Sequence, residues 1–367
     1  MTKYCYIHVP FCESICSYCD FCKLFYNESL VDKYLIALEK EIESIYQNDY
    51  LDTIYIGGGT PSALNLKQLE RLFKILDRLK KNKDIEYTIE GNFESTTLDK
   101  LKLYKKYGIN RLSFGIESIS PKNLKFLDRK TNMKEVETII NTAKKLGFNN
   151  INLDLMYAFP NETKKELEKD IDYLLSLNVE HISTYSLIIE EHTKLYLQKI
   201  KNIEQDLDAE MYEIICKKLK QNNYYHYEIS NFCKENYYSR HNNCYWNNEE
   251  YYGFGLGASS YLNNQRITNT RSINKYLTGI YKYYSENIDM KLKIEYEIIL
   301  NLRKKTGISL SMFQKKYHKK FSELYNYKRL LSEGLLQEAE NSLFIPEDKW
   351  YISNEIITRL LGCEING

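Results

Sequence analysis

Short apolar runs alternate with longer amphipathic stretches between residue 4 and about residue 230. The short runs are rich in β-branched and aromatic residues and predict strands at 4–9, 53–56, 86–90, 111–115, 150–154 and 181–187. The stretches between them carry apolar residues at i, i+3 and i+4 and predict helices at 30–47, 66–79, 97–107, 134–146 and 164–177. This alternation is typical of an α/β fold with a parallel sheet wrapped by helices. Because six strand–helix units fall short of a closed eight-stranded barrel, we expect a partial (β/α)6 barrel with its chemistry at the C-terminal strand ends.

The pattern changes after about residue 230. An aromatic and polar segment, 231–262, leads to a capped helix near 272–279, and further helices are predicted at 290–304, 309–318, 322–332 and 354–361. A short run at 335–338 follows Gly334, and a pair of strands is predicted at 343–345 and 350–352. We therefore expect a barrel over 1–230, a connecting segment over 231–289 and a mostly helical, winged-helix-like domain over 290–367. Winged helices often bind DNA, but the lack of a sustained basic face favours a lid or docking role.

Charge and composition narrow the class of protein. Lys+Arg 51 against Asp+Glu 50 gives a net charge of +1, so the bulk electrostatics favours neither nucleic acid nor a membrane surface as partner. No apolar run is long enough for a membrane helix and no apolar signal segment precedes the first cysteine cluster, so we expect a cytoplasmic protein. In that reducing compartment, the 9 cysteines predict free thiols and metal ligation rather than disulfides.

Four cysteines gather in one short segment, at Cys12, Cys16, Cys19 and Cys22. The spacing Cys-x3-Cys-x2-Cys of the first three suits thiolates that hold three irons of a [4Fe–4S] cluster and leave the fourth iron open. The amino and carboxylate groups of S-adenosylmethionine can chelate such an open iron, which places the sulfonium beside an electron source. A structural zinc site is the alternative, although the second Cys/His pair that such sites usually have does not follow.

Polar residues follow the predicted strands at the edge where the chemistry is expected. A glycine turn, 57–59 with Thr60, follows the second strand and could let the backbone approach a ligand closely. Glu90 ends the third strand, Glu117 and Arg129 belong to the fourth unit, and Asp154 ends the fifth strand. Each acid alone could be an ordinary surface residue. Together they indicate a pocket for a polar, ribose-bearing cofactor.

A second group of residues lies in the segment 240–246, which combines His241 with Tyr245 and Trp246. An imidazole beside aromatic side chains could form a flat apolar slot with an axial iron ligand, as haem requires. A solvated or hydrogen-bonded loop histidine is the alternative. The glycine-rich stretch 253–258 that follows indicates a hinge or a close-packing turn. It does not match a dinucleotide-binding fingerprint, because no strand–helix unit with a downstream acid surrounds it.

These motifs resemble the radical S-adenosylmethionine superfamily, and within it the group of anaerobic coproporphyrinogen III dehydrogenases and HemW-type haem chaperones. The resemblance covers most of the chain, through segments 6–12, 57–62, 107–115, 152–154, 227–232 and 241–246. It implies that Cys12, Cys16 and Cys19 ligate the cluster. It further implies a pocket for S-adenosylmethionine lined by Tyr6, Tyr18, Gly58, Gly59, Thr60, Glu90, Arg129 and Asp154. The family usually has Gln where this chain has Glu117.

Two features separate the members of this group. The dehydrogenases resemble Cys-x3-Cys-x2-Cys-x-Cys and carry a longer segment before the loop, whereas this chain has Phe21 at the discriminating position. The segment His-Asn-x-x-Tyr-Trp, present here as His241–Trp246, is associated with the haem-binding chaperones. Cys22 departs from both patterns and is not assigned to the cluster.

The resemblance therefore implies a chaperone that binds a [4Fe–4S] cluster, S-adenosylmethionine and haem and passes the haem to an acceptor protein. We expect no coproporphyrinogen oxidase activity and no nucleic-acid partner, and we leave radical cleavage and a homodimer open. The alternative is an oxygen-independent coproporphyrinogen III oxidase, an oxidative decarboxylase of propionate side chains. A third hypothesis is a zinc-stabilised nucleic-acid-binding protein.

Overall fold

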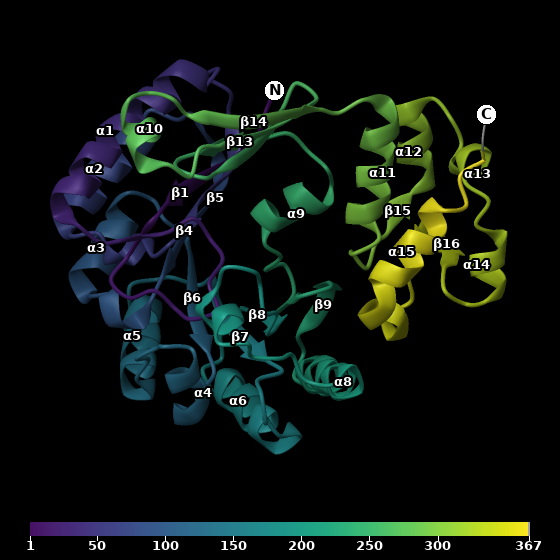
Figure 1. Cartoon of the computed structure of the whole chain (residues 1–367), viewed down its shortest axis with the longest axis horizontal. Helices are drawn as coiled ribbons and strands as arrows, with labels where there is room; N and C mark the ends of the chain where they lie inside the picture. Colours follow the sequence, from purple (N-terminus) through teal and green to yellow (C-terminus); the bar gives the residue numbers. More distant parts are fainter. Residues whose placement is uncertain (366–367) are drawn as a thin grey trace. The chain divides into compact units, whose positions relative to one another are not determined.

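The computed structural model describes residues 1–365 (Figure 1). The chain forms two compact units. The first unit comprises Met1–Asn223 and Glu250–Asn287, and the second unit comprises Tyr224–Glu249 and the chain from residue 288 on. These boundaries differ from the expected 1–230, 231–289 and 290–367, because most of the expected connecting segment belongs to the sheet of the first unit. None of the helices in the described part of the chain combines the length and apolar character that crossing a membrane requires.

Parallel strands form the centre of the first unit. They lie side by side in chain order: β1 (Tyr4–Val9), β4 (Leu51–Gly58), β5 (Lys81–Gly91), β6 (Arg111–Glu117), β7 (Ile151–Tyr157) and β8 (His181–Ser186). Each neighbouring pair in this series is parallel. This arrangement confirms the predicted α/β fold with a partial six-stranded barrel.

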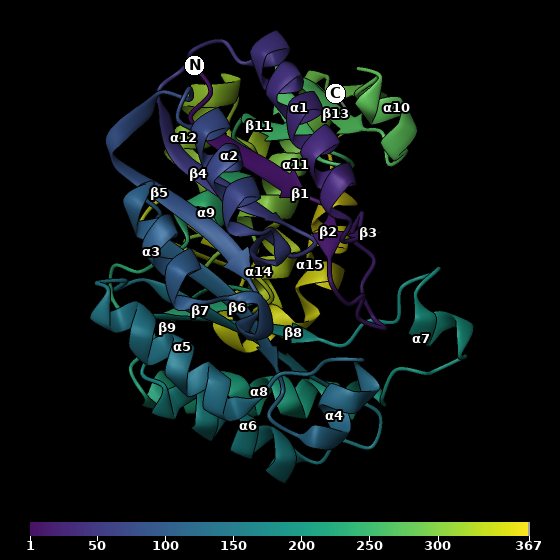
Figure 2. The same ribbon diagram turned by 90° about the vertical axis from the view of Figure 1, so that its left-hand side faces the viewer.

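Helices between these strands cover the outer face of the sheet (Figure 2). They are α1 (Glu28–Ile45), α2 (Leu66–Leu76), α3 (Leu98–Lys106), α4 (Pro121–Phe126), α5 (Met133–Lys145) and α6 (Lys164–Ser176), and α8 (Gln205–Gln221) continues this layer after β8. The short helix α7 (Lys194–Leu197) also follows β8 but stands apart from the layer (Figure 2). Asn65 and Thr163 begin α2 and α6 with reciprocal capping boxes, which satisfy backbone N–H groups that a helix start leaves unpaired. Short 3-10 turns, η1 (Pro61–Ala63) and η2 (Phe93–Ser95), follow β4 and β5.

Additional strands extend this sheet beyond β1. β11 (Tyr251–Phe254) pairs with β1 in parallel, and β12 (Ser259–Leu262), β13 (Gln265–Asn269) and β14 (Lys282–Asn287) follow as antiparallel neighbours. Asn263 and Asn264 join β12 to β13, and both have positive φ, as a tight hairpin turn requires. The predicted helix near 272–279 is present as α10 (Ile273–Leu277).

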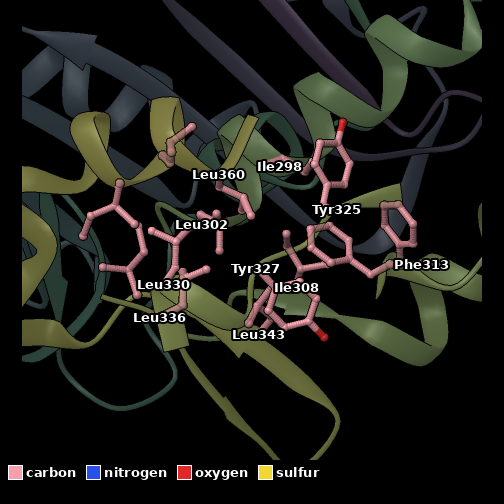
Figure 3. Packing of buried hydrophobic residues seen from close by; sticks show 14 of the residues in the cluster. Ile298, Leu302, Ile308, Phe313, Tyr325, Tyr327, Leu330, Leu336, Leu343 and Leu360 are labelled. Carbon is pink, nitrogen blue, oxygen red and sulfur yellow. The ribbon is translucent and has the colours of Figure 1, made fainter. Parts of the chain in front are cut away.

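The second unit is mostly helical with a small sheet. Its elements are β9 (Tyr225–Glu228), β10 (Asn231–Cys233), α9 (Arg240–Trp246), α11 (Met290–Asn301), β15 (Ile308–Ser309), α12 (Leu310–Tyr317), α13 (Phe321–Leu324), α14 (Lys328–Ser332), β16 (Gln337–Ala339), β17 (Ser342–Phe344), η3 (Glu347–Ile352) and α15 (Ser353–Leu361). β15, β17 and β16 form an antiparallel three-stranded sheet, as expected of a winged-helix-like module. Ile298, Leu302, Leu330, Leu343 and Leu360 belong to its apolar core (Figure 3).

Two predicted elements of this unit are wrong. The single helix expected at 322–332 is divided into α13 and α14, because the chain between them turns Tyr325 and Tyr327 into the core. The strand expected at 350–352 is part of the 3-10 turn η3. Trp350 lies buried there and its indole N–H donates to the carbonyl of Ile345 at 2.9 Å. The turn lets this large side chain fill the core with its polar group satisfied.

Candidate functional site

The cysteine segment forms a closed loop at the C-terminal end of β1. β2 (Phe11–Cys12) pairs with β3 (Leu24–Phe25) and brings the two ends of the loop together. The side chain of Ser17 donates to the carbonyl of Phe126 at 2.8 Å, which fixes the middle of the loop. Cys12, Cys16 and Cys19 line one cavity of about 510 Å³. Cys22 is not among the described residues that line it.

Each of two thiols has a polar partner in this cavity. The hydroxyl of Thr60 lies 3.5 Å from the sulfur of Cys12, and the guanidinium of Arg129 lies 3.8 Å from the sulfur of Cys16. Burial raises the pKa of Cys12 to about 11, and it raises the pKa of Cys16 against the opposing effect of Arg129. Iron binds the thiolate form, so metal binding must displace these protons.

The arrangement of the thiols fits an iron–sulfur cluster. A Cβ at Gly59 would lie 2.9 Å from the sulfur of Cys12, so only glycine leaves this much room beside the loop. Within residues 1–365, no three His, Cys, Asp or Glu side chains converge as the ligands of a single metal ion. A cluster makes a different demand, because each thiolate binds its own iron.

The polar residues predicted for the cofactor pocket line the same cavity, with one exception. The lining includes Tyr18, Gly58, Gly59, Thr60, Glu90, Glu117, Arg129 and Asp154. Most come from β4, β5, β6, β7, the turn after β4 and the cysteine loop, because the carboxyl ends of parallel strands meet at one edge. Arg129 comes from the connection between α4 and α5. Tyr6 is the exception. Its ring packs on Tyr55 with centroids 6.2 Å apart, and its hydroxyl contacts the imidazole of His8 at 3.0 Å.

Glu117 and Arg129 form a buried ion pair at the end of β6, with 3.7 Å between oxygen and nitrogen. Tyr18 donates to Glu117 at 3.1 Å, and Arg129 donates to the carbonyl of Gly115 at 2.6 Å. A Cβ at Gly115 would lie 2.5 Å from the carboxylate oxygen of Glu117, so a larger residue there would force this carboxylate to move. Burial raises the pKa of Glu117, while Arg129 opposes that shift.

Glu90 and Asp154 face the same cavity from neighbouring parts of the sheet. Glu90 accepts hydrogen bonds from the hydroxyl of Tyr55 at 2.7 Å and the backbone N–H of Gly58 at 3.0 Å. Asp154 accepts from the side-chain amide of Asn152 at 2.7 Å. Burial raises the pKa of both carboxyl groups, and Glu90 adds to the effect on Asp154. Such acceptors suit the amino group and ribose hydroxyls of a nucleoside ligand.

The residues that hold these acids were not predicted from the sequence. Asn152 accepts from Ser183 at 3.0 Å and contacts His181 at 2.6 Å, so it fixes the side chain that orients Asp154. Alternate residues of a strand share one face, and Asn152 stands two positions before Asp154. Tyr55 stands two positions before Gly57 on β4, and a Cβ at Gly57 would lie 2.8 Å from the carboxylate of Glu90. The two-residue period of a strand could therefore have identified Asn152 and Tyr55 as neighbours of the predicted site.

The motif residues His241, Tyr245 and Trp246 lie in the second unit. They belong to helix α9, which begins after the N-cap Ser239, so His241 is not the loop histidine of the alternative interpretation. The imidazole of His241 is 1% exposed, and its Nε2 contacts the hydroxyl of Tyr245 at 2.8 Å. These two residues are four positions apart, which places them on one helix face. The buried indole nitrogen of Trp246 has no hydrogen-bond partner among the described residues.

Comparison with known proteins identifies the class of this chain. The model of the Radical SAM superfamily matches residues 6–174. The solved structure of coproporphyrinogen III oxidase (HemN) from Escherichia coli superposes with a TM-score of 0.86 at 21% sequence identity, over 97% of this chain and 89% of that chain. The fold is thus that of a radical SAM protein, a superfamily whose members use a [4Fe–4S] cluster and S-adenosylmethionine.

Curated relatives identify the family more closely. The protein named heme chaperone HemW of Bacillus subtilis (strain 168) is 39% identical over 98% of this chain and 99% of its own length. The heme chaperone HemW of Lactococcus lactis subsp. lactis (strain IL1403) is 35% identical over 98% of both chains. The chain therefore belongs to the HemW family.

Proposed function

We propose that this protein is a haem chaperone that holds a [4Fe–4S] cluster and S-adenosylmethionine in its first unit and passes haem to an acceptor protein. The observation that carries the proposal is the 39% identity to a curated heme chaperone HemW over 98% of the chain. The geometry of the cysteine loop supports the cluster, since the three thiols with the predicted spacing line one cavity.

The residues of the cavity have distinct roles in this proposal. Cys12, Cys16 and Cys19 would hold the cluster, with one iron left open for S-adenosylmethionine. When bound, the cluster and this ligand supply one-electron chemistry at low potential. Arg129 balances negative charge beside Cys16, and the glycine turn after β4 lets the backbone approach the ligand. Glu90, Glu117 and Asp154 accept hydrogen bonds from its polar groups, and Tyr6 supports the pocket from outside the cavity.

Haem binding is assigned to His241, Tyr245 and Trp246. The imidazole would ligate the iron and the two aromatic rings would pack against the macrocycle. Ligation at Nε2 requires the hydroxyl of Tyr245 to leave that nitrogen, because their separation is now 2.8 Å. In this proposal, the contact between His241 and Tyr245 breaks when haem binds. The acceptor protein, a homodimer, a cytoplasmic location and the absence of a nucleic-acid partner remain predictions from the sequence.

The alternative function is oxygen-independent coproporphyrinogen III oxidation. The resemblance to the solved oxidase favours it, but at 21% identity that resemblance concerns the fold alone. The third hypothesis, a zinc-stabilised nucleic-acid-binding protein, loses its basis because the cysteine loop lies within the matched radical SAM region, residues 6–174.

One set of measurements tests the proposal. The chain is reconstituted anaerobically with iron and sulfide, titrated with haem, and then mixed with apomyoglobin as a probe of haem release. A parallel sample receives reductant, S-adenosylmethionine and coproporphyrinogen III. We expect a cluster, stoichiometric haem binding, release to apomyoglobin and no decarboxylated product. Repeated turnover to protoporphyrinogen, or failure to bind haem, contradicts the proposal.

A further inference from the structure

The glycine-rich turn after β11 packs against the end of the cysteine loop. A Cβ at Gly257 would lie 2.6 Å from the Cβ and 2.9 Å from the sulfur of Cys22. A Cβ at Gly255 would lie 2.5 Å from the carbonyl oxygen of His8 and from the hydroxyl of Tyr34. Contacts this short leave no room for any side chain at either position. Of the two possibilities that the sequence left open, the geometry matches a close-packing turn.

A buried carboxylate holds this turn in place. Glu41 of helix α1 accepts hydrogen bonds from the backbone N–H of Gly255 at 2.8 Å, the hydroxyl of Tyr276 at 2.5 Å and the amide of Asn269 at 2.5 Å. Glu41 has no exposed surface, and its burial raises its pKa. A buried carboxylate is retained at this cost only where donors satisfy it. The turn is therefore a rigid part of the first unit.

Cys22 is fixed on its other side through its backbone. Its carbonyl oxygen lies 2.7 Å from Nε2 of His8. Because a carbonyl only accepts, Nε2 carries the proton, and Nδ1 accepts from the hydroxyl of Tyr6 at 3.0 Å. Burial lowers the pKa of His8 to about 4, so the ring stays neutral with this tautomer. Strand β3 begins two residues after this anchor, at Leu24.

We propose that Cys22 and Gly257 are positioning residues for the iron–sulfur cluster. The side chain of Cys22 fills the space above Gly257, and this contact fixes the end of the loop that carries Cys19. This role explains why a fourth cysteine stands in the loop without lining the cavity. The inference rests on the proposed cluster at Cys12, Cys16 and Cys19 and adds a residue pair that determines how that cluster is held.

The first test uses glycines that differ in their surroundings. Gly257→Ala adds a methyl group against Cys22 and also strains a residue with φ of +73°. Gly279→Ala is the matched control, because Gly279 has φ of +86° and no heavy atom within 4 Å of the point where a Cβ would stand. We expect Gly257→Ala to lose about half or more of its iron after anaerobic reconstitution, while Gly279→Ala keeps the wild-type content.

Substitutions of Cys22 test the same contact without altering a glycine. Cys22→Ser keeps the size of the side chain and should retain the cluster, whereas Cys22→Val adds bulk against Gly257 and should lose iron. The double variant Cys22→Gly with Gly257→Ala removes the side chain of Cys22 and places a methyl group on the opposite side of the contact. It should recover iron relative to Gly257→Ala alone, with Cys22→Gly measured as its reference.

Iron and sulfide content, the electron paramagnetic resonance spectrum of the reduced cluster with and without S-adenosylmethionine, and the melting temperature of the apo-protein are measured for every variant. A positioning role predicts changed spectra and iron content at an apo-protein melting temperature equal to that of Gly279→Ala. Full iron and an unchanged spectrum in Gly257→Ala and Cys22→Val overturn the inference, and so does loss of the cluster in Cys22→Ser, which would make Cys22 a ligand. Absence of a cluster in the wild type would instead reject the proposed function.

Discussion

The cavity of the first unit and helix α9 of the second unit hold their polar side chains in different ways. In the cavity, Glu90, Glu117 and Asp154 have raised pKa values because burial is only partly offset by hydrogen bonds and Arg129. In α9, the imidazole of His241 is buried and contacts Tyr245. The cavity therefore presents polar groups to a ligand without rearrangement, whereas α9 must open before a ligand can reach its histidine.

The largest expected effect concerns the cluster in the first unit. Replacing Cys12, Cys16 or Cys19 by Ala should abolish it, because three thiolates and one open iron are required. His241→Ala should retain it, and so should Cys22→Ser, which keeps the size of the side chain. Iron, sulfide and visible absorption after anaerobic reconstitution measure the outcome. Loss of the cluster in the Cys22 variant with retention in the other three would show that the ligand set is misassigned.

The second prediction concerns the decarboxylation of coproporphyrinogen III. Supplied with reductant, S-adenosylmethionine and coproporphyrinogen III, the protein should form no protoporphyrinogen. The expectation rests on the resemblance of the motifs, in which Phe21 stands at the position that distinguishes the dehydrogenases from the chaperones. Chromatography of the products after oxidation to porphyrins decides the question, with a known oxidase as positive control.

The barrel was predictable from sequence because short runs rich in β-branched and aromatic residues alternate with amphipathic helices. The extension β11–β14 was missed, since its short strands are rich in tyrosine and polar residues. A local signal was available in Asn263 and Asn264, whose side chains tolerate the positive φ of a hairpin turn. The break before α14 depends on the burial of Tyr325 and Tyr327, and no local propensity encodes that packing.

The acids of the candidate site were predictable for a different reason. Glu90 stands one residue before the end of β5, and the C-terminal ends of parallel strands converge in any such barrel. Asp154 was expected to end its strand, but β7 continues to Tyr157, so Asp154 faces the cavity from within the strand. The burial of His241 was not predictable, because burial depends on tertiary packing, which the sequence of one short helix does not encode. The pairing of Gly257 with Cys22 joins residues far apart in sequence, so no spacing could reveal it.

The third prediction tests whether α9 opens for haem. His241→Ala should shift the Soret band and lower haem affinity, and Trp246→Ala should give a smaller loss. Loss of an axial ligand should exceed the ~1 kcal/mol typical of an aromatic pair contact. Spectral titration of reconstituted variants with unchanged iron content measures both effects. An unchanged spectrum and affinity in folded His241→Ala would move the haem site elsewhere, with Cys244 the next candidate.

A smaller effect follows from a buried acid of the first unit outside the cavity. Glu162 accepts from the backbone N–H of Phe159 at 3.1 Å, and burial raises its pKa to about 7. Between its ordinary range and about 7, the folded chain holds a proton that the unfolded chain has lost, so stability falls as pH rises. Glu162→Gln has no such carboxyl group and should not show this fall in stability with rising pH. Relative to wild type, its apo-protein melting temperature should rise by about 2 °C between pH 5 and pH 8.

His226 of the second unit should show the opposite and weakest pH response. Its ring stacks on Phe232 at 4.0 Å and meets Trp350 edge-on at 4.4 Å, and burial lowers its pKa despite Glu347. As pH falls below the ordinary range of histidine, the unfolded chain takes up a proton that the folded chain resists, so stability falls. His226→Phe keeps a ring of similar shape and has no such proton. Its melting temperature relative to wild type should therefore increase as pH falls from 7 to 5, and a gap that stays constant or narrows would show that His226 is protonated within the fold.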